Sequence, residues 1–154
     1  EHRLGLPDIQ EVIATMAPLE GALDFVEWVK ERFQLIILSD TFYEFSQPLM
    51  RQLSFPTLFC HRLVADESGT IVDYKLRQKD PKRQCVIAFH GLNFRVIAAG
   101  DSYNDTTMLS EADAGILFRA PDNVVSDFPP FPSVSSYDEL RLELITASNR
   151  GLIL

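Results

Sequence analysis

The chain has 154 residues, 46% of them hydrophobic and 10% aromatic, which suits one globular domain and excludes a disordered or fibrous chain. Asp and Glu number 22 against 14 Lys and Arg, a net charge of −8 that argues against a nucleic-acid or anionic-membrane partner. No apolar run is long enough to span a membrane, no signal-peptide pattern opens the chain, and Cys60 and Cys85 suit a reduced compartment, so we expect a cytoplasmic protein.

The N-terminal part of the chain has helical patterns followed by one short apolar run. Asp8 and Asp24 both lie in helical patterns. Pro18 is expected to open a helix at its first turn. The inward face of that helix would carry Leu19, Ala22, Leu23, Val26 and Val29. The run 35–38, Leu-Ile-Ile-Leu, predicts a strand that is buried on both faces.

The next segment predicts a helix and then a hairpin. Thr41 and Glu44 have capping-box spacing, so a helix should begin at Thr41. Pro48 lies inside that helix and should kink or shorten it. Residues 59–76 have the pattern of a hairpin, with Asp-Glu-Ser-Gly at 66–69 as its turn.

The C-terminal half alternates helices and strands. Asp80 as N-cap and Pro81 at the first helical position predict a helix to about Gly91. Strands are predicted at 96–99 and 114–118, and the Pro-rich stretch 127–132 is predicted to be a loop. Capping pairs predict two more helices, one from Ser102 with Asp105 and one from Ser136 with Glu139. The alternation favours an α/β fold with a mainly parallel sheet.

Polar residues that follow the predicted strands carry the candidate chemistry, because ligands of such sheets bind beyond the carboxyl ends of the strands. A hydroxyl, an ammonium and carboxylates converge there, near helix N-termini that favour phosphate. Two aspartates four apart suit Mg²⁺. Each residue also has an ordinary structural explanation as a cap, a solvated lysine or a turn. The candidates are Ser39, Asp40, Thr41, Lys82, Gly100, Asp101, Ser102, Asn104 and Asp105.

Other chemistries have little support. The sequence has no glycine-rich dinucleotide fingerprint, no phosphate-loop lysine motif and no Gly-x-Ser-x-Gly elbow. His2, His61 and His90 lack metal-ligand spacing, and Cys60-His61 is best explained as part of a strand.

The candidate residues resemble motifs of the haloacid dehalogenase superfamily of phosphotransferases. Residues 35–39 resemble its second motif, an apolar strand that ends in Ser or Thr, and Lys82 resembles the lysine of the third. Residues 100–105, Gly-Asp-Ser-Tyr-Asn-Asp, are similar to the fourth, Gly-Asp-x-x-x-Asp. Segments 37–45, 78–84 and 99–107 are most similar to its phosphoserine phosphatases, including those that also transfer the phosphoryl group to homoserine.

The resemblance implies a Mg²⁺-dependent phosphoserine phosphatase of amino-acid biosynthesis. It implies that Ser39 and the Asp40 backbone hold the transferring phosphoryl group, and that Lys82 neutralises its charge and steadies the nucleophile. It also implies that Asp101 ligates Mg²⁺, that Asn104 touches phosphoserine and that Asp105 orients the metal loop. Phosphoryl transfer needs mainly positioning and charge stabilisation, which a metal and a lysine supply. Water and homoserine would attack the same aspartyl-phosphate, so the sequence leaves the acceptor open.

One family motif is missing from the sequence. The first motif, Asp-x-Asp or Asp-x-Glu at the end of the first strand, supplies nucleophile and general acid, and neither pattern occurs here. Asp40 follows a strand, but no second acid follows it, so it is a poor substitute. The resemblance therefore implies a Rossmannoid parallel sheet with helices on both faces that lacks the first strand and most of the helical cap. Residues 1–17 would be a cap remnant and 18–154 the core.

Two hypotheses follow from the missing motif. In the first, the chain belongs to a phosphatase whose nucleophile lies elsewhere. In the second, it is a non-catalytic module that binds phosphate or a partner. Family topology places the absent strand between the strands at 35–39 and 95–99. Their open edges would favour self-association or pairing with a complementing segment, and we expect the chain alone to be unstable or to aggregate.

Overall fold

The computed structural model describes residues 5–150, so His2 and the first four residues of the predicted cap remnant lie outside it. The chain divides into two compact units, Glu1–Lys79 and Asp80–Leu154. Each unit has its own three-stranded sheet. No helix in the described part of the chain is long and apolar enough to cross a membrane.

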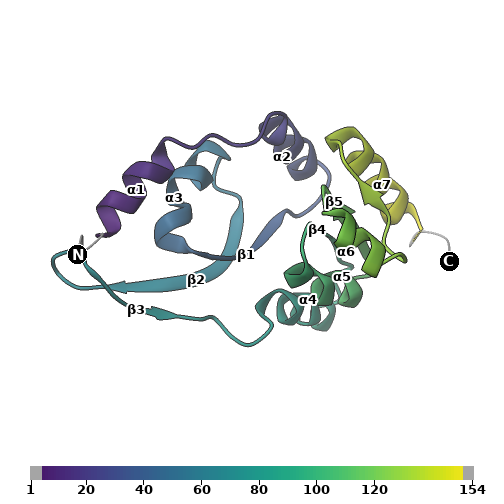
Figure 1. The fold of residues 1–154 in the computed structure, drawn as a ribbon. Helices are drawn as coiled ribbons and strands as arrows, with labels where there is room; N and C mark the ends of the chain where they lie inside the picture. The colour runs from purple at the N-terminus through teal and green to yellow at the C-terminus, as the bar shows by residue number, and fades with distance from the viewer. Residues whose placement is uncertain (1–4, 151–154) are drawn as a thin grey trace. The chain divides into compact units, whose positions relative to one another are not determined.

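The first unit contains a mixed sheet and three helices (Figure 1). Strand β2 is central, pairing with β1 in parallel and with β3 in antiparallel orientation. Helix α3 packs against α1 and against β1 and β2. In chain order the elements are α1 (Leu6–Ala14), α2 (Ala22–Lys30), β1 (Ile36–Phe42), α3 (Tyr43–Gln52), β2 (Thr57–Ala65) and β3 (Ile71–Lys75).

The hairpin prediction is confirmed, with β2 and β3 joined through the expected turn. Gly69 has φ 81°, a left-handed conformation that glycine adopts without steric cost. The Asp66 carboxylate accepts hydrogen bonds from the backbone N–H groups of Ser68 and Thr70, at 2.9 and 3.0 Å. An Asp that bonds to the backbone ahead of it is typical of such a turn.

The predicted helix from Pro18 begins later than expected. Gly21 stands before α2 with φ 78°, and this left-handed residue prevents a continuous helix from Pro18. Val26 and Val29 are buried as predicted, whereas Leu19 and Leu23 are 64% and 47% exposed, so their assignment to an inward face was wrong.

The prediction that a helix begins at Thr41 was also wrong. Strand β1 continues through Thr41 to Phe42, and α3 begins at Tyr43. The Glu44 carboxylate accepts a hydrogen bond from the Leu63 backbone N–H at 2.9 Å, in place of the predicted capping contact. A long-range pairing with β2 therefore outweighs the local capping pattern.

Pro48 does not end helix α3, which runs on to Gln52. Proline has no N–H, so the Glu44 carbonyl one turn earlier lacks its usual helical donor. The Gln10 side-chain amide of α1 donates to that carbonyl at 2.8 Å. The neighbouring helix thus satisfies the group that Pro48 leaves unpaired.

The second unit is built on a fully parallel sheet in the order β4-β5-β6. Helices α5 and α7 both contact β4 and β5, and they lie on different sides of these strands in Figure 1. Its elements are α4 (Pro81–Gly91), β4 (Ile97–Gly100), the short 3₁₀ helix η1 (Tyr103–Asp105), α5 (Thr106–Glu111), β5 (Ala114–Phe118), α6 (Asp122–Asp127), β6 (Ser133–Val134) and α7 (Tyr137–Asn149).

Most predictions for this unit are confirmed, although α6 and β6 were not foreseen. Helix α4 and strands β4 and β5 fall within a residue or so of their predicted bounds. The Ser136 hydroxyl caps α7 by accepting from the Glu139 N–H at 3.3 Å. Backbone N–H groups of Ser135 and Ser136 lower the pKa of Glu139 to about 2.

Strands β1 and β4 are edge strands, which corrects the prediction that residues 35–38 are buried on both faces. Within residues 5–150, β1 pairs only with β2 and β4 only with β5. Residues 35–38 are half-buried, and in β4 Ala98 is buried while Ala99 is exposed. Each apolar strand thus has an unpaired edge within the described chain, to which a further strand could pair.

Candidate phosphate and metal site

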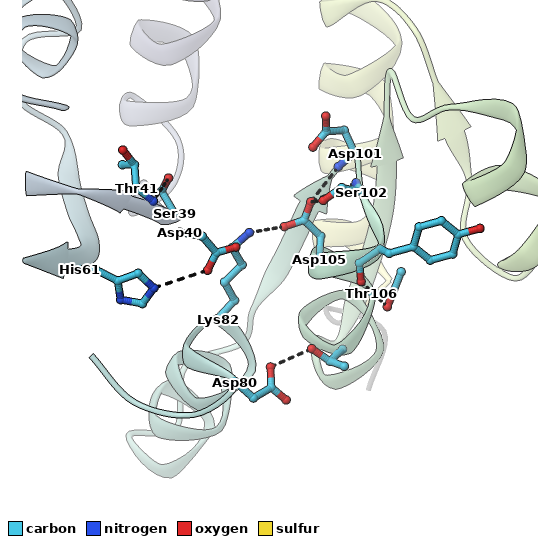
Figure 2. A network of polar contacts seen from close by, with 12 residues as sticks. Ser39, Asp40, Thr41, His61, Asp80, Lys82, Asp101, Ser102, Asp105 and Thr106 are labelled. Atoms are coloured by element: carbon cyan, nitrogen blue, oxygen red, sulfur yellow. Dashed lines mark hydrogen bonds and ion pairs between the residues drawn. The ribbon is translucent and has the colours of Figure 1, made fainter. Parts of the chain in front are cut away.

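The Asp105 carboxylate is the centre of a polar network in the second unit (Figure 2). Its Oδ1 accepts a hydrogen bond from Lys82 Nζ at 2.8 Å. Its Oδ2 accepts from the backbone N–H groups of Asp101 and Ser102, at 3.0 and 3.1 Å, and from the Ser102 hydroxyl at 3.0 Å. Both carboxylate oxygens are therefore engaged, and the loop that follows β4 is folded around them.

The electrostatics of Asp105 favour the ionised carboxylate. Asp105 is only 6% exposed, and burial by itself would raise its pKa. The hydrogen bond and positive charge of Lys82, with the bonds from Ser102 and Asp101, outweigh that effect and hold the pKa of Asp105 below its usual value. Lys82 and Asp105 thus form a buried, charge-assisted pair.

Gly100 allows the loop to close on Asp105. A Cβ atom at Gly100 would lie 2.5 Å from the Asp105 Cβ, closer than non-bonded carbon atoms approach. Any side chain at this position would push Asp105 away from Lys82. The glycine of the Gly-Asp sequence is therefore required by this close approach.

Lys82 is placed by the start of helix α4. Asp80 precedes this helix with φ 49°, and its carboxylate accepts from the Thr107 hydroxyl of α5 at 2.9 Å. Asp80 thus occupies the predicted N-cap position, but its side chain links two helices and does not cap its own. Arg83 and Glu111 form a second link between α4 and α5, at 2.8 Å. These contacts hold the Lys82 backbone against the Asp105 loop.

Asp101 and Asn104 are exposed on the same loop, and the residues there fit a magnesium ion. Mg²⁺ commonly takes one or two carboxylates, with waters and substrate phosphate completing its shell. Both Asp105 oxygens are already engaged, so the Asp101 carboxylate is the one that this loop offers to a cation. Among residues 5–150, no group of three or more His, Cys, Asp or Glu side chains is arranged to hold a metal.

Ser39, Asp40 and Thr41 form a bulge in strand β1 of the first unit. Leu38 pairs with Phe59 and Phe42 with His61, so these three residues stand opposite the single residue Cys60. The Thr41 N–H donates to the Ser39 hydroxyl at 3.3 Å. The bulge turns the strand backbone at the position where the second motif was identified.

The structure brings Lys82, Asp101, Asn104 and Asp105 onto neighbouring segments of one unit, and Ser39 and Asp40 onto one bulge of the other. Two further side chains contact these residues. The hydroxyl of Ser102, which is both a candidate residue and a predicted helix cap, donates to the Asp105 carboxylate. His61, predicted only as part of a strand, has its Nε2 3.9 Å from Asp40 Oδ1. The capping pattern at 102–105 signals the first contact, whereas no sequence signal reveals the second, which depends on strand register.

Comparisons with known proteins agree with this geometry. Residues 4–113 match the family model of haloacid dehalogenase-like hydrolases. The whole chain is 70% identical to "Phosphoserine phosphatase" of Pseudomonas syringae pv. tomato and 69% identical to "Phosphoserine phosphatase ThrH" of Pseudomonas aeruginosa. The chain spans 65% of the length of the first relative and 75% of the second.

Solved structures show the same fold at low identity. A substrate-bound phosphoserine phosphatase complex superposes with a TM-score of 0.76 at 20% identity, covering 94% of this chain and 70% of that one. A phospho-aspartyl intermediate analogue of phosphoserine phosphatase superposes with a TM-score of 0.69 at 20% identity, covering 81% of this chain and 63% of that one. With the family model matched over most of the sequence and the third and fourth motifs joined by the Lys82–Asp105 pair, the chain belongs to the haloacid dehalogenase-like hydrolases.

Proposed function

We propose that this chain is the larger part of a Mg²⁺-dependent phosphoserine phosphatase. The observation that carries the proposal is the identity of about 70% over all 154 residues to two proteins named phosphoserine phosphatase. The Asp105 network supports it, because the network sets a lysine ammonium and an available carboxylate on adjoining segments. We use the term complete protein for this chain together with the segment that supplies the nucleophile.

The roles of the residues follow from their contacts. Lys82 stabilises negative charge on the phosphoryl group, and Asp105 positions both Lys82 and the loop. Asp101 would hold Mg²⁺, which when bound supplies charge to the phosphoryl oxygens. Ser39 and the Asp40 backbone N–H would bind phosphoryl oxygens, since a bulged strand turns its backbone groups away from the ladder. Asn104, exposed on η1, would contact the serine portion.

The nucleophile is inferred to come from outside these residues, because the sequence has no Asp-x-Asp or Asp-x-Glu. In the complete protein the phosphoryl group would pass from the serine oxygen to an aspartate carboxylate, with a proton delivered to the leaving oxygen. Water would then attack the aspartyl-phosphate and release inorganic phosphate. Asp40 is the alternative nucleophile within the chain, and it lacks the second acid of the family motif.

Three finer assignments remain part of this proposal. Homoserine is the alternative to water as acceptor of the phosphoryl group, because its hydroxyl can attack the same intermediate. Residues 1–17 would be a remnant of the helical cap and 18–154 the core. The unpaired edges of β1 and β4 favour a complementing strand, or self-association where none is present.

The test is phosphate release from O-phosphoserine, with and without Mg²⁺, by the complete protein and by its Asp101→Asn variant. We expect Mg²⁺-dependent release that the variant loses, because the substitution removes the carboxylate proposed to hold the cation. A parallel reaction with homoserine, analysed for homoserine phosphate, separates the two acceptors. Absence of phosphate release from the complete protein would refute the phosphatase assignment.

A second candidate function is a non-catalytic phosphate-binding module, favoured by the absence of the nucleophile motif. Such a chain would gain thermal stability from phosphate with Mg²⁺ and release nothing from phosphoserine. The 154-residue chain alone is the sample for this comparison. Release by that chain would instead mean that an aspartate within it is the nucleophile, and an Asp40→Asn variant would test the leading candidate.

A further inference from the structure

His61 is a buried histidine of β2 for which the proposed reaction has no role. It is 7% exposed, and its ring packs near Phe42, with ring centroids 6.0 Å apart. Phe42 also contacts Phe45 and Tyr74. Phe42 thus joins His61 to an aromatic cluster beside strand β1. A buried imidazole is normally satisfied at both ring nitrogens.

The hydrogen bond at Nδ1 of His61 determines which ring nitrogen carries the proton. His61 Nδ1 lies 3.0 Å from the Arg77 backbone nitrogen, whose N–H can only donate. Nδ1 must therefore be the acceptor, and the ring proton of neutral His61 sits on Nε2. Nε2 lies 3.9 Å from Asp40 Oδ1, so its N–H faces the Asp40 carboxylate (Figure 2).

The direction of the Asp40 carboxylate matters because of its place in the bulge. Its backbone N–H is proposed to hold the phosphoryl group, and a carboxylate on the same residue would repel a phosphate that approached it. The Asp40 side chain is 43% exposed, and the His61 Nε2–H is one group that acts on its direction. This N–H donor on β2 attracts the carboxylate toward β2.

We propose that His61 is a positioning residue, whose Nε2–H orients the Asp40 carboxylate so that the Ser39–Thr41 bulge can receive a phosphoryl group. The inference rests on the proposed function, to which it adds a residue from outside the family motifs. At 3.9 Å the interaction is electrostatic and weaker than a direct hydrogen bond, so its loss should weaken phosphate binding only moderately.

Two substitutions separate the two ring nitrogens. In His61→Asn the amide oxygen sits near the position of Nδ1 and keeps an acceptor for the Arg77 N–H, while the donor toward Asp40 is lost. In His61→Gln the amide nitrogen reaches the position of Nε2 and restores that donor, while the Arg77 N–H loses its acceptor. The first variant tests positioning and the second tests a structural role.

The measurements are the KM for O-phosphoserine and the dissociation constant for inorganic phosphate with Mg²⁺, on the complete protein. We expect His61→Asn to raise both by about threefold to tenfold with kcat little changed. His61→Gln should stay near wild type in both while melting at a lower temperature. In an Asp40→Ala background His61→Asn should have no further effect on phosphate binding, because the carboxylate it acts through is gone.

Unchanged constants in His61→Asn, or equal losses in His61→Asn and His61→Gln, would overturn the proposal. Additive effects of His61→Asn and Asp40→Ala on phosphate binding would also overturn the proposal. His90→Asn, in the second unit, is the control for replacing a histidine and should leave both constants unchanged. If the wild type binds phosphate but does not hydrolyse phosphoserine, the proposed function fails while phosphate binding still tests His61. If the wild type binds no phosphate, the proposed function and the role of His61 both fail.

Discussion

Asp105 shows how one carboxylate can organise a site without itself being available to a ligand. Its two oxygens accept from Lys82, from Ser102 and from two backbone N–H groups. A buried carboxylate with so many donors is held in one orientation, which leaves the exposed Asp101 as the carboxylate open to a cation.

Asp105→Asn should destabilise the complete protein by about 2–4 kcal/mol at pH 7, because it removes the buried carboxylate that accepts from the Lys82 ammonium. Urea unfolding measures the change. Asp101→Asn is the matched control on the same loop, and as an exposed substitution it should alter stability by less than about 0.5 kcal/mol. Equal effects of the two substitutions would contradict the asymmetry between these aspartates.

The stability difference between wild type and Asp105→Asn should depend on pH. The pKa of Asp105 is lowered by folding, so its contribution is present above the pKa of the unfolded chain, about 3.9, and is lost as pH falls through the folded value. The unfolding free energies of wild type and Asp105→Asn should therefore differ strongly at pH 7 and less at pH 3. A constant difference would mean that charge is not the cause.

At the scale of elements, helix α3 depends on its neighbour. Pro48 removes the donor to the Glu44 carbonyl, and Gln10 of α1 supplies another. The same glutamate accepts from Leu63 of β2 through its carboxylate. A residue whose spacing predicts a helix cap is therefore used to connect the helix to the sheet and to α1.

Gln10→Ala should cost about 1 kcal/mol of unfolding free energy, because it leaves a part-buried carbonyl without a donor. The loss should be smaller in a Pro48→Ala background, where residue 48 regains the N–H that bonds to Glu44. Denaturant unfolding of the complete protein and of its Gln10→Ala, Pro48→Ala and double variants gives the coupling free energy. Gln47→Ala, on an exposed position of α3, is the control and should have little effect. Additive effects of the Gln10 and Pro48 substitutions would refute the compensation.

At the scale of the whole molecule, the main feature is a pair of apolar edge strands. Strands β1 and β4 each have one partner within residues 5–150, and their residues are less buried than those of β5. Parallel strands are normally buried and paired on both sides, so these edges leave backbone groups available for pairing with another strand.

We expect the 154-residue chain alone to self-associate or to unfold without a sharp transition. Sedimentation velocity and a thermal melt at neutral pH measure this, with the complete protein as the control that should unfold cooperatively. A cooperative melt from a monomer of the short chain would show that the open edges do not limit its stability.

Local patterns were enough to predict much of the second unit from the sequence. The starts of helix α4 and of the capped helix α7 depend on residues close together in the chain, as does the bond from Ser102 to Asp105. Strands β4 and β5 were predicted from their short apolar runs. The fourth motif and the lysine of the third motif were likewise visible, because their residue types and order are specific. Family membership followed from those residues.

Tertiary structure decided the features that depend on distant partners. The course of β1 through Ser39–Thr41, the rescue of Pro48 by Gln10 and the approach of His61 to Asp40 each join residues far apart in the chain. Their energies come from strand register and helix packing, which no local spacing encodes. The sequence alone therefore determined the chemistry that these residues can perform, whereas tertiary structure decided which atoms face one another, because only packing brings distant segments together.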